Sequence, residues 1–346
     1  MFVESRGQHN KNKKVVAVMI EGGIGDHLLA TPLLRVMRKN FAAKDYYLVL
    51  MSMYYEIFGY KVPLGYVPTN PNIDFLYSMR DPLDFYTSWA RSADVIYRVN
   101  PYIMSPHRIG DRHLAETWCD AHGFQIDELK LDFYPTDTEI KQVEALFSTF
   151  ENPVVVIHPF GSFDPIEHVK ATTNKDWYND RWQFIISWIT NRGYDVIQLG
   201  KVGEHIFDDV FSLVGHANIR ESVLITKYAD FFISIDSFIM HAAKVFGTLG
   251  VALWGRTNPF RVGYPENYNL YKLHACPEIF CGRPEGILFD VNPNHIQFTP
   301  WNCPHRNCMD AITVQDVCKG IGHIENNIQI DPATYIRELK PRVSIV

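Results

Sequence analysis

Three short segments of the sequence place polar side chains beside glycine or directly after an apolar run. They are Glu21–Asp26, His158–Ser162 and Asp236–His241. Ligands of open parallel sheets bind outside the carboxyl ends of the strands, and each segment follows an expected strand. The polar side chains and free helix amides at such an edge can hold hydroxyl groups or phosphates. We therefore treat these segments as candidate binding loops.

The first loop is rich in glycine and reads Gly22-Gly23-Ile24-Gly25-Asp26. Glycine lets a ligand approach the backbone closely, and the following helix offers free N–H groups to an anion. The loop is not a full Gly-x-Gly-x-x-Gly fingerprint, so by itself it is weak evidence for a dinucleotide site. Considered alone, Asp26 is more simply explained as a helix cap than as a catalytic carboxylate.

Two further candidates lie in the second half of the chain. Lys175 can meet a phosphate as a point charge, although an ordinary exposed lysine is the simpler interpretation. Asp236 ends an apolar run and can accept hydrogen bonds from sugar hydroxyls, while Ser237 opens a helix whose amides can cradle a diphosphate. The alternative is a capped helix in which His241 is a satisfied core histidine.

Four of the six cysteines form two pairs, with four residues between the members of each pair: Cys276 and Cys281, then Cys303 and Cys308. The arrangement is similar to a four-thiolate site for structural zinc or iron, although the usual short spacing is two. The alternative is two pairs of reduced structural cysteines, since disulfides are not expected in the cytoplasm. Cys119 and Cys318 are expected to be ordinary buried cysteines.

Strands and helices alternate along the chain, as needed to bring the loops to sheet edges. In the first half, a strand at 15–20 leads through the glycine turn into a helix with Leu29, Leu33, Val36 and Met37 on one face, and a strand follows at 46–51. Prolines between 63 and 106 obscure the order of the next elements. A helix is expected at 138–150, and Glu151-Asn152-Pro153 breaks it. Strands then recur at 154–157, 195–199, 231–235 and 250–253, with helices at 180–191 and 239–246. This alternation predicts an α/β fold with parallel sheets.

Composition excludes several classes of protein. The chain has 346 residues, 47% of them hydrophobic, which suits two globular domains. Its net charge of −6 lacks the basic surplus of a nucleic-acid binder. The sequence has neither a long apolar span nor a secretory leader, so we expect a cytoplasmic protein. The basic run at 11–14 allows at most peripheral membrane contact.

The motifs, in order, resemble those of one known family. They are Gly23-Ile24-Gly25-Asp26 with Ala30-Thr31-Pro32, His158-Pro159, Lys175-x-Trp177, Leu199-Gly200-x-x-Gly203-Glu204, Asp236-Ser237-x-x-Met240-His241, Gly255-x-Thr257-x-Pro259 and the tail Cys303-Pro304 to Cys308-Met309. Their order and spacing resemble the ADP-heptose:lipopolysaccharide heptosyltransferases, glycosyltransferase family nine. The resemblance covers roughly 15–40 and 154–320.

The resemblance implies a GT-B fold with two facing Rossmann-like domains: an acceptor domain at 1–150, a nucleotide-sugar domain at 151–325, and a C-terminal helix at 326–346 packing back on the first. It implies an inverting transferase of lipopolysaccharide biosynthesis, which moves a heptose from ADP-heptose to a glycan, lipid-linked or protein acceptor. The sequence places no Asp-x-Asp metal clamp at an expected strand end, so we expect metal-independent catalysis. Asp26 would be the general base and Lys175 would stabilise the diphosphate. The implied donor-binding residues are Gly25, Ser162, Gly200, Glu204, Asp236, Ser237, Phe238, His241 and Thr257.

The sequence departs from the family pattern near the donor. Phe238 stands where glycine is usual, and Tyr178 stands where proline is frequent. A phenylalanine narrows or reshapes the pocket, so the donor sugar can differ from heptose. Two other functions stay open: a nucleotide-sugar epimerase of GT-B fold, and a catalytically silent nucleotide-sugar-binding protein.

Overall fold

The computed structural model describes residues 13–41, 45–63, 65–81, 91–100, 112–161, 175–276, 279–280 and 307–326. The chain divides into two compact units, Met1–Lys141 and Gln142–Val346. The division lies inside helix α6 (Asp137–Phe147), slightly before the boundary that the sequence suggests at 150. The C-terminal helix expected within 326–346 lies almost wholly outside the described residues.

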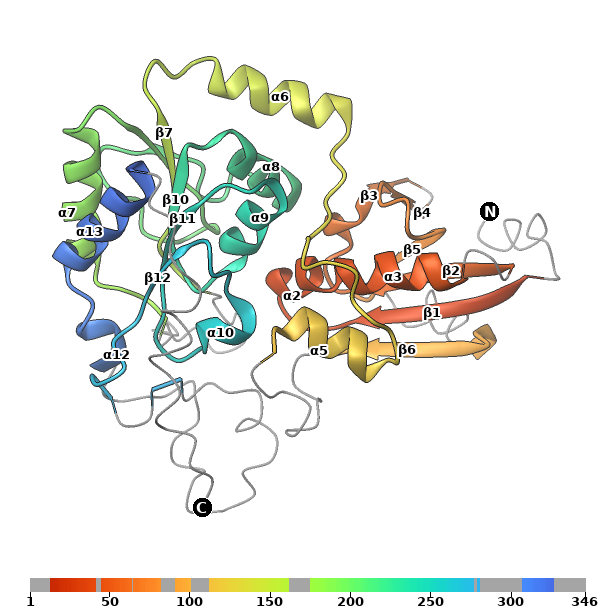
Figure 1. Cartoon of the computed structure of the whole chain (residues 1–346). Helices are drawn as coiled ribbons and strands as arrows, with labels where there is room; N and C mark the ends of the chain where they lie inside the picture. Colours follow the sequence, from red (N-terminus) through yellow and green to blue (C-terminus); the bar gives the residue numbers. More distant parts are fainter. Residues whose placement is uncertain are drawn as a thin grey trace, which may run out of the picture. The chain divides into compact units, whose positions relative to one another are not determined.

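Unit 1 is built on a parallel sheet of four strands in the order β5-β2-β1-β6. The strands are β1 (Lys14–Ile20), β2 (Tyr46–Ser52), β5 (Phe75–Ser78) and β6 (Val95–Val99). Strand β1 lies in the middle because its apolar run is buried, with Val16, Ala17 and Val18 fully inaccessible. Helices α3 (Thr31–Phe41) and α5 (Leu114–Ala121) contact each other beside this sheet (Figure 1). The smaller elements are α2 (Ile24–Leu29), the 3-10 turn η1 (Tyr55–Ile57) and the antiparallel hairpin of β3 (Gly59–Val62) and β4 (Gly65–Pro68).

The prediction of a single helix after the glycine loop is wrong in one respect. The structure has two helices, α2 and α3, which are separated at Ala30. The division follows from Pro32, which has no N–H to donate to the carbonyl of Leu28. That carbonyl instead accepts a hydrogen bond from the Thr31 hydroxyl, at 2.7 Å. The segment that carries Asp26 is therefore a helix of its own, six residues long.

Unit 2 contains a parallel sheet of six strands in the order β12-β11-β10-β7-β8-β9. The strands are β7 (Val154–His158), β8 (Asp195–Gln198), β9 (Phe211–Ser212), β10 (Phe231–Ile235), β11 (Gly250–Leu253) and β12 (Tyr268–Leu270). The helices are α7 (Asn179–Thr190), α8 (Ile219–Tyr228), α9 (Phe238–Phe246), α10 (Pro259–Val262), α12 (Asn307–Asp310) and α13 (Val314–Glu325). The expected α/β fold with parallel sheets is confirmed.

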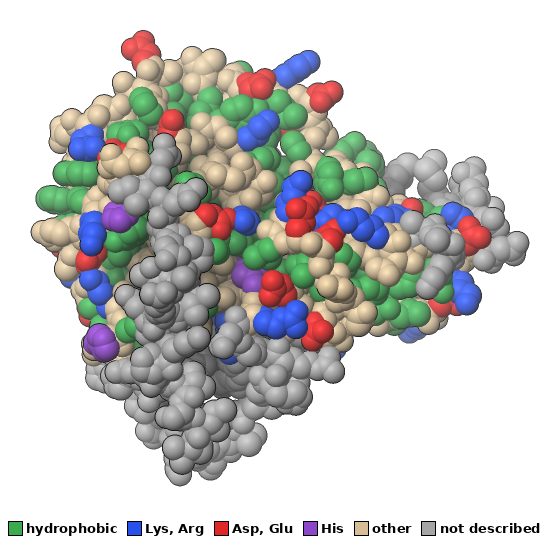
Figure 2. All heavy atoms as spheres, viewed as in Figure 1, with side chains coloured by type: hydrophobic (Ala, Val, Ile, Leu, Met, Phe, Trp, Pro, Cys, Tyr) green, Lys and Arg blue, Asp and Glu red, His purple; other side chains and the backbone are tan. Residues whose placement is uncertain are grey.

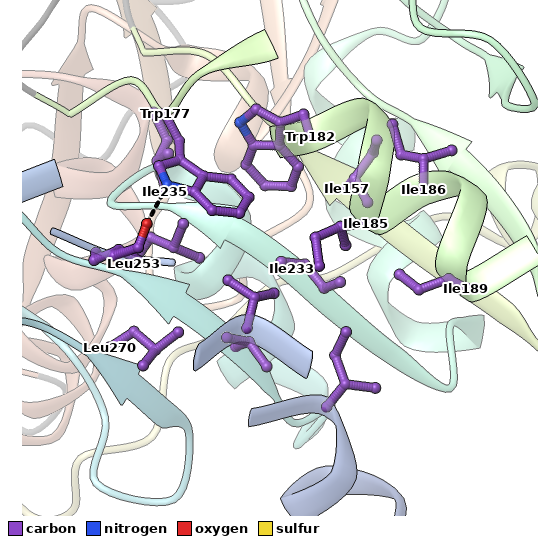
Figure 3. Close-up of a cluster of buried hydrophobic side chains, with 14 of the residues drawn as sticks. Ile157, Trp177, Trp182, Ile185, Ile186, Ile189, Ile233, Ile235, Leu253 and Leu270 are labelled. Atoms are coloured by element: carbon purple, nitrogen blue, oxygen red, sulfur yellow. Dashed lines mark hydrogen bonds between the residues drawn. The ribbon is translucent and has the colours of Figure 1, made fainter. Parts of the chain in front are cut away.

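Helices cover both faces of this sheet. Helices α7 and α13 lie on one face, and α8 and α9 lie on the other (Figure 1). On the α7 face, alternate residues of β10 join a core with Trp177 and Trp182, whose rings meet edge to face at 5.5 Å (Figure 3). Trp177 Nε1 donates to the carbonyl of Ile312 at 2.9 Å, the dashed line in Figure 3. This core fixes the strands whose ends carry the candidate residues.

Charged side chains of both signs are mixed on the face shown in Figure 2. In unit 1, Arg35 pairs with Asp127 at 2.9 Å, and such pairing limits the extent of any single-sign potential. Among the described residues, no helix has both the length and the apolar character needed to cross a bilayer.

Candidate functional site

The glycine loop of unit 1 is shaped by a left-handed residue and closed by Asp26. Gly22 has φ of +97°, a conformation that side chains other than hydrogen disfavour. Gly23 caps α2, and its N–H donates to Asp26 Oδ2 at 2.7 Å. Asp26 is half-buried at the third position of the helix. The carboxylate thus serves as a helix cap, the interpretation favoured for it alone, and this position also leaves it partly accessible.

Strand β6 anchors the beginning of the same loop. Glu21 N–H donates to Val99 O at 2.9 Å, and the Glu21 carboxylate pairs with Arg98 at 2.6 Å. Burial raises the pKa of Glu21, but hydrogen bonds from Arg98 and Asn100 outweigh it and hold the pKa below its usual value. Glu21 is consequently a charged anchor of the loop.

A histidine next to Asp26 holds the other side of Gly23. His27 is fully buried, and its Nδ1 lies 2.8 Å from Gly23 O. Because a carbonyl only accepts, Nδ1 carries the proton. Burial lowers the pKa of His27 to about 4, so the ring is neutral at physiological pH. Sequence reasoning did not single out His27.

In unit 2, Lys175 and Asp236 form a buried ion pair. Lys175 Nζ lies 2.6 Å from Asp236 Oδ2 and 3.5 Å from the Asp236 carbonyl. The side chains are 26% and 8% exposed, so Lys175 is not an ordinary surface lysine. Burial raises the pKa of Asp236, but Lys175 and a hydrogen bond from Thr257 lower it below its usual value. Asp236 is therefore an anion directly after β10.

The first turn of α9 begins beside this ion pair. Ser237 is the N-cap residue, and Phe238 is the first helical residue. The Phe238 ring meets the His158 ring edge to face at 5.4 Å. His158 ends β7 and is buried, and burial lowers its pKa to about 4. Phe238 and His158 therefore form an uncharged aromatic pair at the edge of the sheet.

His241 has the position of a core histidine, the alternative considered for it above. It is 5% exposed, and its Nδ1 lies 2.7 Å from the hydroxyl of Tyr264. Burial lowers the pKa of His241 to about 4. Its Nδ1 is already occupied, so this nitrogen supports α9 from within.

The loop after β8 brings a second carboxyl group to the same edge. A Cβ on Gly200 would lie 2.2 Å from Glu204 Oε2, so a larger residue would displace this carboxyl from its present position. Burial raises the pKa of Glu204 to about 7, and the Asp176 charge adds to the effect. Asp176 itself accepts from Gly161 N–H at 2.9 Å. Glu204 can therefore act as donor or acceptor near neutral pH.

The structure brings most of the expected residues to one edge of the unit 2 sheet. His158 ends β7, and Glu204, Asp236 and Thr257 follow the neighbouring strands β8, β10 and β11. Arg256, 6% exposed and directly after β11, was missed by sequence reasoning. The available signal in the sequence was the position of this arginine between two motif residues, Gly255 and Thr257. Gly25 lies in α2, within unit 1, and Ser162 lies outside the described residues.

The cysteines are only partly described. Cys276 is half-buried after β12, and Cys308 is buried in α12, while Cys281 and Cys303 lie outside the described residues. In the described part of the chain, no three potential metal ligands cluster. Cys119 is buried as expected, and burial raises its pKa to about 12, whereas Cys318 is only half-buried. The expected four-cysteine site remains a prediction.

Comparison with known proteins finds a family match for part of the chain. Residues 111–276 match the family model of "Glycosyltransferase family 9 (heptosyltransferase)". The match covers slightly less than half of the chain. The resemblance to this family seen in the sequence is thereby confirmed for these residues. A search of curated protein sequences finds no match.

Solved structures related to family 9 share the fold across both units. The family 9 glycosyltransferase from Veillonella parvula has 15% identity, a TM-score of 0.62, and coverage of 91% of this chain and 97% of its own. ADP-heptose LPS heptosyltransferase II of E. coli has 13% identity, a TM-score of 0.63, and coverage of 91% and 99%. The iron-containing dodecameric glycosyltransferase TibC of enterotoxigenic E. coli has 17% identity, a TM-score of 0.63, and coverage of 92% and 78%. At these identities the likeness shows the fold, which is of the GT-B type.

Proposed function

We propose that this protein is a glycosyltransferase that moves a heptose from ADP-heptose to an acceptor hydroxyl, with inversion at the anomeric carbon. The observation that carries the proposal is the buried Lys175–Asp236 pair beside the N-terminus of α9. Helix N-termini and lysines both favour phosphate oxygens. The name of the E. coli neighbour, ADP-heptose LPS heptosyltransferase II, supports the choice of donor.

Lys175 can bridge the protein and the diphosphate. An ammonium group has three N–H donors, and Asp236 accepts at most two of them through its carboxylate and carbonyl oxygens. The third is directed to a phosphate oxygen of the donor. Asp236 keeps Lys175 charged and in place, and its carboxylate can also accept from a sugar hydroxyl. The α9 amides supply further donors as the diphosphate leaves.

Lys175 and the α9 amides provide the positive charge that a divalent ion provides in other transferases. We therefore expect turnover to continue in the presence of EDTA. Glu204, with a pKa near 7 and a buried Oε2, suits hydrogen bonding to a hydroxyl of the nucleotide. Phe238 and His158 form an uncharged aromatic wall that restricts which groups of the donor can lie beside it.

Asp26 is assigned as the general base. A carboxylate is a weak base for an alcohol, so it accepts the proton as the hydroxyl attacks the anomeric carbon. The bond to the diphosphate breaks in the same step, and the pyrophosphate oxygen takes the electron pair. The acceptor hydroxyl belongs to a glycan, a glycolipid or a protein.

The experiment measures ADP release and product mass with ADP-heptose and one acceptor of each class. We expect transfer by the wild type and by Lys272→Met, a control in a different ion pair of unit 2. Asp26→Asn should lower turnover by about 100-fold or more, because general-base catalysis typically contributes that much. Donor affinity, measured by calorimetry, should be unchanged. Retention of more than about a tenth of the turnover contradicts the assignment of the base.

We also propose that Cys276, Cys281, Cys303 and Cys308 hold one structural zinc or iron ion. Four thiolates suit a closed tetrahedral site, which stabilises folding and leaves no position for substrate. The two described members, Cys276 and Cys308, belong to the same unit. The iron named for TibC supports a metal in a protein of this fold. Elemental analysis of protein purified without a metal-affinity tag should find close to one ion per chain.

A further inference from the structure

The peptide groups of Gly23 are held from both sides by consecutive residues of α2. Asp26 Oδ2 accepts from Gly23 N–H at 2.7 Å, and His27 Nδ1–H donates to Gly23 O at 2.8 Å. Asp26 and His27 therefore bind the same residue of the glycine loop. A shift of Gly23 changes the position of the Asp26 carboxylate, because the two are joined by a hydrogen bond.

The His27 ring also connects this loop to the next strand end. Its centroid lies 5.2 Å from that of Tyr54, with the rings at 85°, and 6.2 Å from that of Phe58. Both partners follow β2 (Tyr46–Ser52), so the ring links the ends of β1 and β2. His27 is 0% exposed and cannot contact a substrate in this arrangement. Its polar contact with Gly23 O is directed to the backbone that positions Asp26.

We infer that His27 is a positioning residue, which holds Gly23 through Nδ1 so that the Asp26 carboxylate faces the acceptor hydroxyl. This inference rests on the proposed role of Asp26. Burial keeps His27 neutral, so it adds no positive charge beside the carboxylate. The effect of His27 on catalysis is then one of geometry alone, and a misplacement of about 1 Å can reduce turnover by roughly 100-fold.

Two amide variants separate this role from general packing. The side-chain N–H of His27→Asn lies where Nδ1–H lies, whereas that of His27→Gln lies near the Nε2 position. We expect His27→Asn to keep kcat within a few-fold of wild type, and His27→Gln to lower kcat by about 10- to 100-fold with the donor KM unchanged. His122→Gln is the matched control, because His122 also meets a tyrosine, Tyr97, at 5.4 Å and 86° in the same unit.

If the wild type transfers no heptose, the proposed function is overturned but the inference about His27 is not. A structural measurement then tests the inference by itself. In protein labelled with ¹⁵N-glycine, the Gly23 amide signal is assigned through its loss in Gly23→Ala. This signal should move in Asp26→Asn and in His27→Gln, and stay near its wild-type position in His27→Asn and His122→Gln. The inference is overturned if Asn and Gln at 27 give equal kcat in an active enzyme, or if the Gly23 signal is the same in both variants.

Discussion

Removal of Lys175 should leave Asp236 as an uncompensated buried charge, and Lys175→Met tests this. Breaking a buried ion pair from one side costs about 3–5 kcal/mol, and the 26% exposure of Lys175 reduces this to roughly 2–4 kcal/mol. In a domain of this size, each kcal/mol lowers Tm by about 2–4 °C. We therefore expect the unit 2 transition to fall by roughly 5–15 °C at pH 7.

The effect should depend on pH in a defined direction. In the wild type, the pKa of Asp236 is below its usual 3.8, so the ion pair stabilises the fold above that pH and is lost as pH falls further. In Lys175→Met, the burial that raises the pKa of Asp236 is opposed only by the Thr257 hydrogen bond and by His241, so the pKa should rise and protonation on acidification should reduce the penalty. The difference in Tm between wild type and variant should therefore be largest near pH 7 and shrink towards pH 4.

Lys272→Met provides the control, measured by calorimetry under the same conditions. Lys272 Nζ lies 2.7 Å from Asp316 Oδ1, close to the Lys175 distance, but the two side chains are 35% and 24% exposed. An ion pair of this kind contributes about 0.2–1 kcal/mol, so Tm should fall by only a few degrees. The reasoning is refuted if both variants lose the same Tm, or if the loss in Lys175→Met does not diminish in acid.

Three further changes test the donor edge and the cysteines. Phe238→Gly removes the ring that meets His158 and should change the ranking of nucleotide-sugars by kcat/KM, whereas an unchanged ranking would place Phe238 outside the pocket. Glu204→Gln should remove a pH dependence of Tm. Because the pKa of Glu204 is raised to about 7, the wild type loses stability as pH rises from about 4.5 to 7, and the Tm of the variant should rise relative to that of the wild type over this interval. Parallel profiles of Tm against pH would contradict this. Cys303→Ser should lower both metal content and Tm while its folded fraction still transfers heptose, and wild-type protein with well under one ion per chain would exclude the site.

The sequence predicted the strands near the site well because each is a short apolar run bounded by turn residues. The expected strand at 250–253 coincides with β11 (Gly250–Leu253), and that at 231–235 coincides with β10 (Phe231–Ile235). Since parallel strands bring their carboxyl ends to one edge, the position of Asp236 followed from the pattern, whereas Thr257 was expected only from the family resemblance. The apolar periodicity did not predict the break between helices α2 and α3 at Ala30. The apolar face continues through this point, but Pro32 has no N–H to donate to the carbonyl of Leu28.

The contacts between distant residues were not predictable from the sequence. Lys175 and Asp236 are 61 positions apart, and no local pattern pairs them. Nothing in the sequence distinguishes His27, and its role is visible only from the contact of its Nδ1 with Gly23 O. His241 had two interpretations in the sequence, and only the Tyr264 contact distinguishes them. Tertiary packing determines each of these contacts, and a single sequence contains no direct record of it.

The short helix α2 has a consequence for protein engineering. A six-residue helix is too short to be stable by itself in water, so neighbouring parts of unit 1 must hold it in place. Leu28 and Leu29 are at most 1% exposed, and His27 rests on Tyr54 and Phe58 from beyond β2. Grafting residues 21–31 onto another parallel sheet would therefore transfer the motif without its support. A working graft must also carry the aromatic residues that follow the neighbouring strand, which makes the transplantable module discontinuous in sequence.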